Sequence, residues 1–535
     1  MRTKLSWGVL VALATATTLG HAAADEVVQT QSGRVAGVED GAGVTAFRGL
    51  PYAMPPVGAL RWRPPQPAAA WTGIRSGAAF GPVCPQPVSP RRPIDPIDPA
   101  ADVVSEDCLT LNIWRPAGAP ADAKLPVLFW IHGGAFVSGA GSRPGLNGGS
   151  FAKQGLVVVT INYRLGPLGF LAHPLLTAEG GKQKSGNHGL LDQVAALQWV
   201  QRNIAAFGGD PAQVTIAGHS AGGVSVATLL ASPLAQGLFA RAIDQSGPVE
   251  GITQTTRTLA QAEALGETFL GNRGATDLQA MRALPVSALL AADPRDPAQR
   301  ATWAPMVDGH VTPTLPADAY LAGRQAHVPL MMGVASFESG AMFARGTPRE
   351  QLSRLAAVFH GDRQDLVLSH YPHATDDAAA QATGLMLGDP MFAATLAYAS
   401  CHLRTGSPTW IYVFDHTPPG PASAREGAFH GAELPYMFDN LQYTLRPWTD
   451  TDRALAKTML RRWTQFVKTG NPNADGLPRW QPFNGALDSM AQLRADGPAR
   501  PLPTAARIQL YFPDLTPYSR PPGSPATGQT CALKP

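Results

Sequence analysis

Charged residues are scarce in this sequence of 535 residues, and neither sign predominates. Asp, Glu, Lys and Arg together make up 15% of the chain, and the formal net charge is +3. Loss of Arg2 and Lys4 with a cleaved leader would reduce this charge to +1. A chain so close to neutrality lacks the basic surface on which binding to nucleic acid or another polyanion depends. We therefore expect no nucleic-acid partner, while a hydrophobic content of 44% suffices for a large buried core.

Long apolar runs are missing beyond the first 24 residues. Those residues begin with basic Arg2 and Lys4, continue with an apolar run at 5–19, and end with three alanines. The run is shorter than the ~20 residues that a membrane-spanning helix needs, and the alanines resemble a signal-peptidase cleavage site. We interpret residues 1–24 as a secretory signal peptide. The mature chain is then expected in the periplasm or outside the cell, without a membrane anchor.

Cysteine is also rare, but its number is even. The chain has four, at Cys84, Cys108, Cys401 and Cys531. In an exported chain this favours disulfides over buried free thiols, although four cysteines allow three pairings. Cys84 and Cys108 bracket a proline-rich loop, which we expect to form a surface rim.

Strand-like and helical segments alternate along most of the sequence. Short runs rich in β-branched residues predict strands, at 109–114, 127–131, 156–163, 240–245, 328–334 and 409–415. Apolar residues at helical spacing predict an amphipathic helix at 190–207, and helical patterns recur over 250–300 and 350–402. This alternation is typical of an α/β fold, with a mostly parallel sheet covered by helices. The later helical stretches are expected as insertions above the carboxyl edge of the sheet.

The first part of the mature chain looks different. Glycine-broken β-type runs at 27–47 predict antiparallel hairpins at a sheet edge, and the prolines at 47–65 predict an extended arm without regular structure. We find no internal repeat and no sharp change in composition. Residues 25–535 are therefore expected to form a single domain.

The five residues at 218–222 match a known catalytic motif. Gly218-His-Ser-Ala-Gly222 follows the β-formers Val214 and Ile216 and precedes a helical pattern. This strand, tight turn and helix form the G-x-S-x-G nucleophile elbow, which holds the hydroxyl of Ser220 exposed above a sheet. An ordinary glycine-rich turn is the alternative interpretation.

A serine hydroxyl needs a base, and the base needs an acid that holds its tautomer. In folds with this elbow the three groups follow in the order Ser, Asp or Glu, His, on loops after strands. Glu338 and His430 occur in that order after strands expected at 328–334 and 409–415. Asp308 is the rival acid and is expected to start a turn, whereas His416 is a rival base that lies too close to its strand. His132, His188 and His219 are expected to be packing or loop residues.

With these residues the chain resembles the type-B carboxylesterases, the α/β-hydrolases that include cholinesterases and many bacterial esterases. The matching motifs span most of the mature chain: Ser105-Glu-Asp-Cys-Leu-Thr-Leu-Asn112, Trp130-Ile-His-Gly-Gly-Ala-Phe136, Gly186-Asn-His-Gly-Leu-Leu-Asp-Gln193, Phe207-Gly-Gly-Asp-Pro211 and Ala428-Phe-His-Gly-Ala-Glu433. The resemblance implies hydrolysis of small-molecule carboxylic esters through an acyl-enzyme, with no metal and no organic cofactor. Ser220 would be the nucleophile, His430 the base and Glu338 the acid.

The resemblance also implies supporting residues. Backbone amides of Gly134, Ala135 and Ala221 would form the oxyanion hole, in agreement with a glycine-rich turn after a strand. It further implies two disulfides and two ion pairs, namely Cys84–Cys108, Cys401–Cys531, Arg61–Glu106 and Arg164–Asp192.

Two departures from the family narrow the expectations. Residues 85–107 contain no Phe, Tyr or Trp, which argues against choline esters because no ring is available there for a cation–π contact. Phe337-Glu338-Ser339 stands where Asp-Glu-Gly is common in the family.

A catalytically silent binding or adhesion protein of the same fold is the alternative function, but such proteins typically lose the nucleophile, which is present here.

Overall fold

The computed structural model describes most of the chain, with several gaps. The described residues are 26–87, 103–182, 184–247, 256–291, 303–338, 347–495, 497 and 499–513. The expected signal peptide and Cys531 lie outside these ranges. Among the helices of the described residues, none is long and apolar enough to cross a membrane.

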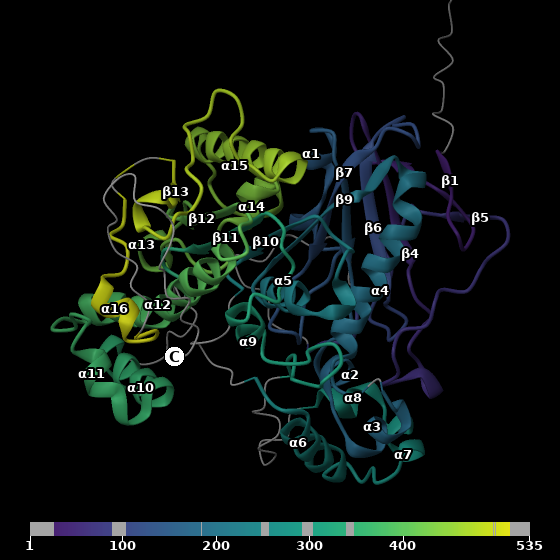
Figure 1. Cartoon of the computed structure of the whole chain (residues 1–535), viewed down its shortest axis with the longest axis horizontal. Coiled ribbons are helices and arrows are strands. Elements are labelled where there is room, and N and C mark those ends of the chain that lie inside the picture. The colour runs from purple at the N-terminus through teal and green to yellow at the C-terminus, as the bar shows by residue number, and fades with distance from the viewer. Residues whose placement is uncertain are drawn as a thin grey trace, which may run out of the picture.

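The centre of the molecule is a ten-stranded sheet, in the order β13-β12-β11-β10-β9-β7-β8-β6-β4-β3 (Figure 1). Its strands are β3 (Val38–Glu39), β4 (Val44–Pro51), β6 (Thr110–Pro116), β7 (Leu125–Ile131), β8 (Val157–Ile161), β9 (Gly209–His219), β10 (Arg241–Gln245), β11 (Leu330–Ala335), β12 (Thr409–Phe414) and β13 (Ala491–Leu493). The strands from β8 to β13 in this order pair in parallel, while β6, β4 and β3 are added antiparallel at one end. The mostly parallel sheet expected from the sequence is thereby confirmed.

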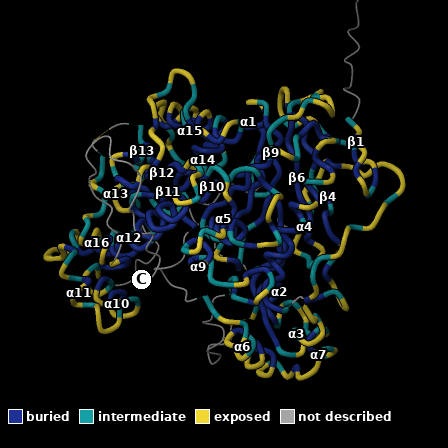
Figure 2. The backbone as a smooth tube through the Cα atoms, in the orientation of Figure 1, coloured by how far each residue is buried: buried dark blue, intermediate teal, exposed yellow. Residues whose placement is uncertain are grey.

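The parallel strands are apolar because helices cover both of their faces. Every residue of β8, β11 and β12 is buried, as is typical of a two-sided parallel sheet. Side chains of α4 (His188–Asn203), α5 (Ala221–Ala231) and α12 (Asp376–Leu403) share one buried cluster. Those of α1 (Gly149–Ala152) and α15 (Asp450–Thr469) belong to a second cluster on the opposite face. Figure 2 shows the buried backbone running through the sheet, with the exposed segments at the periphery.

Two groups of short helices extend away from the sheet. The first group is α6 (Leu259–Gly271), α7 (Leu278–Ala283) and α8 (Val286–Leu290), and the second is α10 (Pro348–His360) and α11 (Gln364–Leu368). In Figure 1 they lie at two different places along the lower side of the molecule. The first group packs against α2 (Gly166–Phe170) and α3 (Pro174–Gly180), which follow the carboxyl end of β8. Capping boxes, Thr258 with Gln261 and Thr347 with Glu350, define where α6 and α10 begin.

The proline-rich arm at 47–65 was predicted to lack regular structure, and this is wrong for its first part. β4 continues through Leu50 to Pro51 and pairs with β6, with a register shift between Phe47 and Leu50. Gly49, with φ +66°, permits that irregularity. Pro51 is the last residue of the strand, where the missing N–H does no harm. A separate small sheet contains β1 (Val27–Gln29), β2 (Arg34–Ala36) and β5 (Ile74–Ser76).

The cysteines are placed only in part. Cys84 and Cys108 form a disulfide with an S–S distance of 2.04 Å, so the first expected pairing is confirmed. Cys401 is fully buried in α12. The pairing of Cys401 with Cys531 falls outside the described residues and stays a prediction.

Candidate active site

The nucleophile elbow joins β9 to α5. Ser220 sits between them with φ 58° and ψ −124°, a conformation that costs energy and is found where surrounding structure enforces it. Close packing explains its glycines. A Cβ at Gly222 would lie 2.1 Å from the carbonyl oxygen of Ile131, and one at Gly218 would lie 2.4 Å from the backbone of Gly222. The N–H of Ser220 donates to the carbonyl of Gln245 on β10 at 2.8 Å, which fixes the turn on the sheet.

Glu338 and His430 are brought together from segments 92 residues apart. Glu338 follows β11 and His430 lies in the loop after β12, so both sit at the carboxyl edge, as Ser220 does. Nδ1 of His430 lies 2.6 Å from Oε2 of Glu338. The carboxylate accepts two more hydrogen bonds at Oε1, from the hydroxyl of Ser246 at 2.6 Å and from the N–H of Ala335 at 2.8 Å. Three donors therefore hold this carboxylate in one orientation.

The imidazole of His430 is placed beside the elbow. Its ring centroid lies 4.5 Å from that of His219, the residue before Ser220. A Cβ at Gly431 would meet Cε1 of the same His219 ring at 3.3 Å. Because Nδ1 of His430 faces Glu338, Nε2 is the nitrogen left to exchange a proton at the site.

Electrostatics favour a basic imidazole at His430. Burial by itself lowers the pKa of His430, but the charge of Glu338 and its hydrogen bond more than offset this and raise the pKa above its ordinary value. The imidazolium that forms when His430 accepts a proton is therefore stabilised where the mechanism would need it.

The turn after β7 has the geometry of an anion-binding loop. Ala135 and Phe136 have φ of 54° and 62°, and a Cβ at Gly134 would lie 2.0 Å from the carbonyl oxygen of Ser138. The N–H groups of Val137 and Ser138 both donate to the carbonyl of Gly134 at 3.0 Å and close the turn. By contrast, the amides of Gly134, Ala135 and Ala221 donate to no acceptor among the described residues. These three N–H groups are available to a ligand, as an oxyanion hole requires.

Neighbouring segments hold the turn after β7 in place. The N–H of Gly166 donates to the carbonyl of Phe136 at 2.7 Å. His132 stacks on Tyr163 with ring centroids 4.4 Å apart, and burial lowers the pKa of His132 to about 4. His132 is thus a neutral packing residue, as expected from the sequence.

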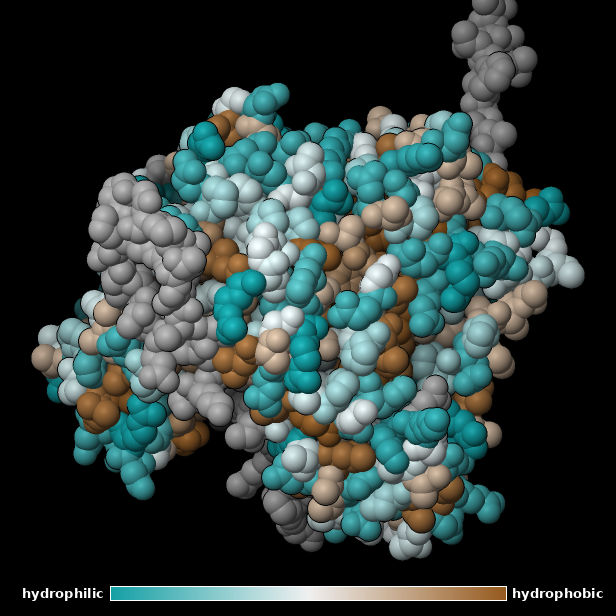
Figure 3. Space-filling view, in the orientation of Figure 1, coloured by the Kyte–Doolittle hydropathy of each residue, from teal (hydrophilic) through white to brown (hydrophobic). Residues whose placement is uncertain are grey.

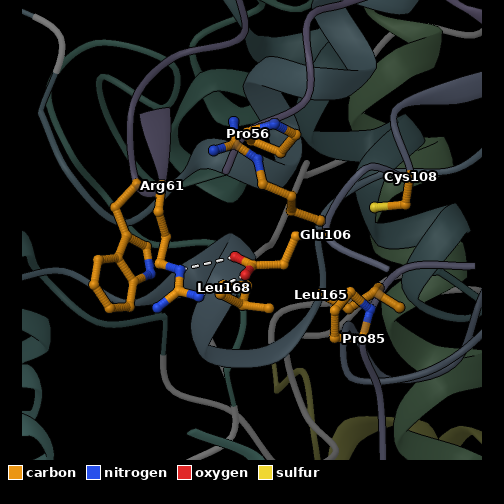
Figure 4. Close-up of a pocket in the computed structure, with 9 residues that line it drawn as sticks. Pro56, Arg61, Pro85, Glu106, Cys108, Leu165 and Leu168 are labelled. Carbon is orange, nitrogen blue, oxygen red and sulfur yellow. Dashed lines mark hydrogen bonds and ion pairs between the residues drawn. The ribbon is translucent and has the colours of Figure 1, made fainter. Parts of the chain in front are cut away.

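A small pocket lies next to Cys108 of the disulfide. It is lined by Arg61, Glu106, Cys108, Leu165 and other residues (Figure 4). Its charges are already matched, because Arg61 forms two hydrogen bonds to Glu106 at 2.5 and 2.8 Å. Arg164 likewise binds Asp192 at 2.7 and 2.8 Å. Both ion pairs expected from the resemblance are confirmed.

The rival candidates have other partners. The carboxylate of Asp308 accepts from the N–H groups of His310 and Thr312, each at 2.9 Å, which makes it a turn residue. Nε2 of His416 lies 2.8 Å from Oδ1 of Asp452, in contact with α15 rather than with Glu338.

Sequence reasoning missed two residues of this site. Ser246, with φ 51°, holds Glu338 from the end of β10; its position directly after a strand was the available signal. Glu433 lies within the family motif at 428–433, but the sequence did not indicate a role for it. It is fully buried, with Oε1 3.8 Å from Nε2 of His219.

Comparison with known proteins shows which family the chain resembles. A family model described as the carboxylesterase family matches residues 24–509. A fumonisin B1 esterase from Sphingopyxis macrogoltabida is 38% identical over 477 residues, covering 85% of this chain and 84% of the relative. A para-nitrobenzyl esterase from Bacillus subtilis is 36% identical over 514 residues, covering 91% and 99%.

Solved structures are similar over the same span. A thermophilic PNB esterase superposes with a TM-score of 0.77 at 34% identity, covering 91% of this chain and all of the other. A second PNB esterase gives a TM-score of 0.73 at 34% identity, covering 88% and 96%.

Proposed function

The chain belongs to the carboxylesterase family and is a carboxylic ester hydrolase with the α/β-hydrolase fold, and we propose that it works through Ser220, His430 and Glu338. The observation that carries this proposal is the 2.6 Å hydrogen bond between His430 and Glu338, beside the strained elbow of Ser220. The carboxylate of Glu338 is fixed by two further hydrogen bonds. Binding proteins of this fold that lack activity typically lose the nucleophile, whereas Ser220 is present in this chain.

The proposed reaction has two halves. Oγ of Ser220 attacks the ester carbonyl while Nε2 of His430 takes its proton, and the amides of Gly134, Ala135 and Ala221 bind the developing oxyanion. The intermediate collapses to an acyl-enzyme, and His430 returns the proton to the departing alcohol. Water then repeats the sequence on the acyl-enzyme and releases the acid.

A burst experiment tests this proposal. With a p-nitrophenyl ester of a short acid, the chain should release nitrophenol rapidly in an amount matched to the enzyme, and then turn over more slowly if deacylation limits the rate. Ser220→Ala should abolish both phases, and mass spectrometry of quenched wild-type enzyme should find the acyl group on the peptide that contains Ser220. An acyl group located on another residue, or turnover retained in Ser220→Ala, would refute the assignment.

We propose small-molecule esters as the substrates. The named relatives are a fumonisin B1 esterase and a para-nitrobenzyl esterase, and the region at 85–107 has no aromatic residue to bind a quaternary ammonium. We expect neutral aliphatic and aromatic esters to have a higher kcat/KM than choline esters of the same acid. A panel of esters graded in acyl and alcohol size, with a choline ester included, measures this directly.

We also propose that the chain is exported and that residues 25–535 form one domain. The layout of residues 1–24 and the Cys84–Cys108 disulfide both fit an oxidising compartment. One sheet that extends from Val38 to Leu493 supports the single domain. The visible surface is largely hydrophilic, with hydrophobic residues scattered over it (Figure 3), as is typical of a protein in water. N-terminal sequencing of protein recovered from the periplasm or medium should begin at Asp25.

A further inference from the structure

A second carboxyl group lies behind the proposed base and has no role in the mechanism above. Glu433 precedes the short helix α14 (Leu434–Met437) and is fully buried. Neither oxygen of its side chain accepts a hydrogen bond of good geometry from the described residues, although the side chain of Gln245 and the backbone N–H of Glu433 lie close enough to lower its pKa. Leaving a buried carboxylate unpaired costs several kcal/mol, so such a group normally holds a proton or has a function that depends on its charge.

The surroundings of Glu433 connect it to the catalytic residues. Oε1 of Glu433 lies 3.8 Å from Nε2 of His219, and that nitrogen also lacks a hydrogen-bond partner among the described residues. The His219 ring in turn packs on the His430 ring, with centroids 4.5 Å apart. Glu433 is therefore one side chain away from the proposed base, on the side of the elbow.

We infer that Glu433 is a proton-carrying positioning residue of this catalytic centre, which sets the basicity of His430 through its charge across the His219 ring. This inference rests on the proposed role of His430. In its neutral form Glu433 leaves His430 to Glu338 alone, and in its ionised form it adds a second negative charge that stabilises the imidazolium. His219 is the spacer that keeps the carboxyl group close to His430 without a direct bond.

The other titratable groups around Glu433 support this behaviour. Burial and the nearby charge of Glu338 raise the pKa of Glu433 to about 7, so its charge changes around neutrality. Burial holds the pKa of His219 well below its ordinary value, so this ring stays neutral. Tyr412 on β12 stays neutral too, because burial raises its pKa well above its ordinary value. The charges of Glu433, Glu338 and Asp244 raise the pKa of Tyr412 further. Glu433 is thus the group near His430 whose charge changes around neutrality.

The pH profile of Glu433→Gln tests the inference. Gln has the size of Glu but cannot ionise, so His430 loses the stabilisation that an ionised Glu433 gives and its pKa falls. We expect the acid limb of kcat/KM to move to lower pH by roughly one unit, while the plateau changes much less. A residue with only a structural role would lower the plateau and leave the midpoint unmoved.

Glu426→Gln is the matched control. Glu426 lies four residues before His430, but its carboxylate is paired with Arg446 at 2.9 Å and is partly exposed. The same carboxyl-to-amide change there should leave the midpoint where it is in the wild type. A midpoint in folded Glu433→Gln equal to that of the wild type would overturn the inference, as would an equal shift in Glu426→Gln.

A second measurement needs no variant. Infrared difference spectra of the wild-type protein, between about pH 6 and about pH 8, should show the loss of a buried protonated carboxyl band as Glu433 ionises around its pKa of about 7. No such band at the lower pH would refute a proton on Glu433. If the wild type itself lacks esterase turnover, the proposed function fails, whereas an active wild type with an unmoved limb in Glu433→Gln refutes this inference alone.

Discussion

Glu338 is the residue on which the geometry of the site depends most. Its carboxylate holds Nδ1 of His430 and is itself held by Ser246 and Ala335. Such a carboxylate selects the tautomer in which Nε2 of the imidazole can accept a proton. Phe337 differs from the residue common in the family, but none of the three hydrogen bonds to the carboxylate of Glu338 comes from it.

Glu338→Gln should lower kcat by about 10³- to 10⁴-fold without unfolding the protein, because the amide keeps the volume but loses the charge and favours the wrong tautomer. Asp308→Asn is the matched control, since it makes the same change in the rival acid, and an amide oxygen can still accept from His310 and Thr312. Steady-state kinetics with circular dichroism measures both. Loss of activity in Asp308→Asn together with an active Glu338→Gln would reverse the assignment.

The pH dependence follows from the raised pKa of His430. Only neutral His430 can accept the proton of Ser220, so kcat/KM should fall as the pH drops through this pKa. Because the charge of Glu338 raises the pKa despite burial, the midpoint should lie above the ~6.5 of an ordinary histidine. In Glu338→Gln the residual activity should show a midpoint at lower pH. A wild-type midpoint well below that of free histidine would contradict this assignment of charge.

The residues that the sequence predicted for the site, and those that it did not point to, differ in a physical way. Ser220 directly follows β9, Glu338 lies three residues after β11, and His430 lies in the loop after β12. The strands that precede these residues can be identified from local patterns. Ser246 and Glu433 act across neighbouring strands, on Glu338 and beside His219. Those contacts depend on the order β11-β10-β9 in the sheet, which local sequence does not encode.

At the scale of elements, tight packing between the elbow and β7 leaves no room for side chains at particular glycines. Periodicity and β-branched runs predicted the central strands within a few residues. The prolines of the arm were misleading because Pro51 ends a strand and therefore does not interrupt its pairing. Proline shows where an N–H is missing, but only the partner strand shows whether that N–H was needed.

Gly222→Ala should damage the elbow. The added Cβ would lie 2.1 Å from the carbonyl oxygen of Ile131, which is backbone and cannot move aside. We expect a loss of ~3 kcal/mol in the free energy of unfolding, together with loss of turnover as α5 is pushed from the sheet. Chemical denaturation with parallel esterase assays measures both.

Gly388→Ala is the control for this prediction. It places the same methyl group in α12, next to the Cβ of Glu338 at an ordinary contact distance of 3.5 Å. Alanine is favoured over glycine by ~1 kcal/mol inside a helix, so this variant should be as stable as the wild type or more so. Equal stability of the two variants would mean that the elbow can relax, and that its glycines are not required by packing.

At the scale of the whole molecule, the Cys84–Cys108 disulfide links two segments that are distant in the sequence. The bridge spans 24 positions, and closing such a loop stabilises a protein by ~3 kcal/mol when the entropy of the unfolded chain is considered. Among the described residues no cysteine is free, and none belongs to the proposed catalytic set. Redox state should therefore act on stability and leave the chemistry itself intact.

Reduction and alkylation separate these two effects. Dithiothreitol should lower the unfolding temperature of the wild type, whereas a thiol-alkylating reagent without reductant should leave turnover unchanged. A Cys84→Ser, Cys108→Ser double variant should start at a lower unfolding temperature while retaining kcat at moderate temperature, because no cysteine belongs to the proposed catalytic set and the ion pairs Arg61–Glu106 and Arg164–Asp192 remain. Any further fall that dithiothreitol causes in the double variant would report the predicted Cys401–Cys531 bridge. Loss of activity on alkylating the unreduced wild type would instead reveal a functional thiol, and the proposal of an oxidising location would have to be withdrawn.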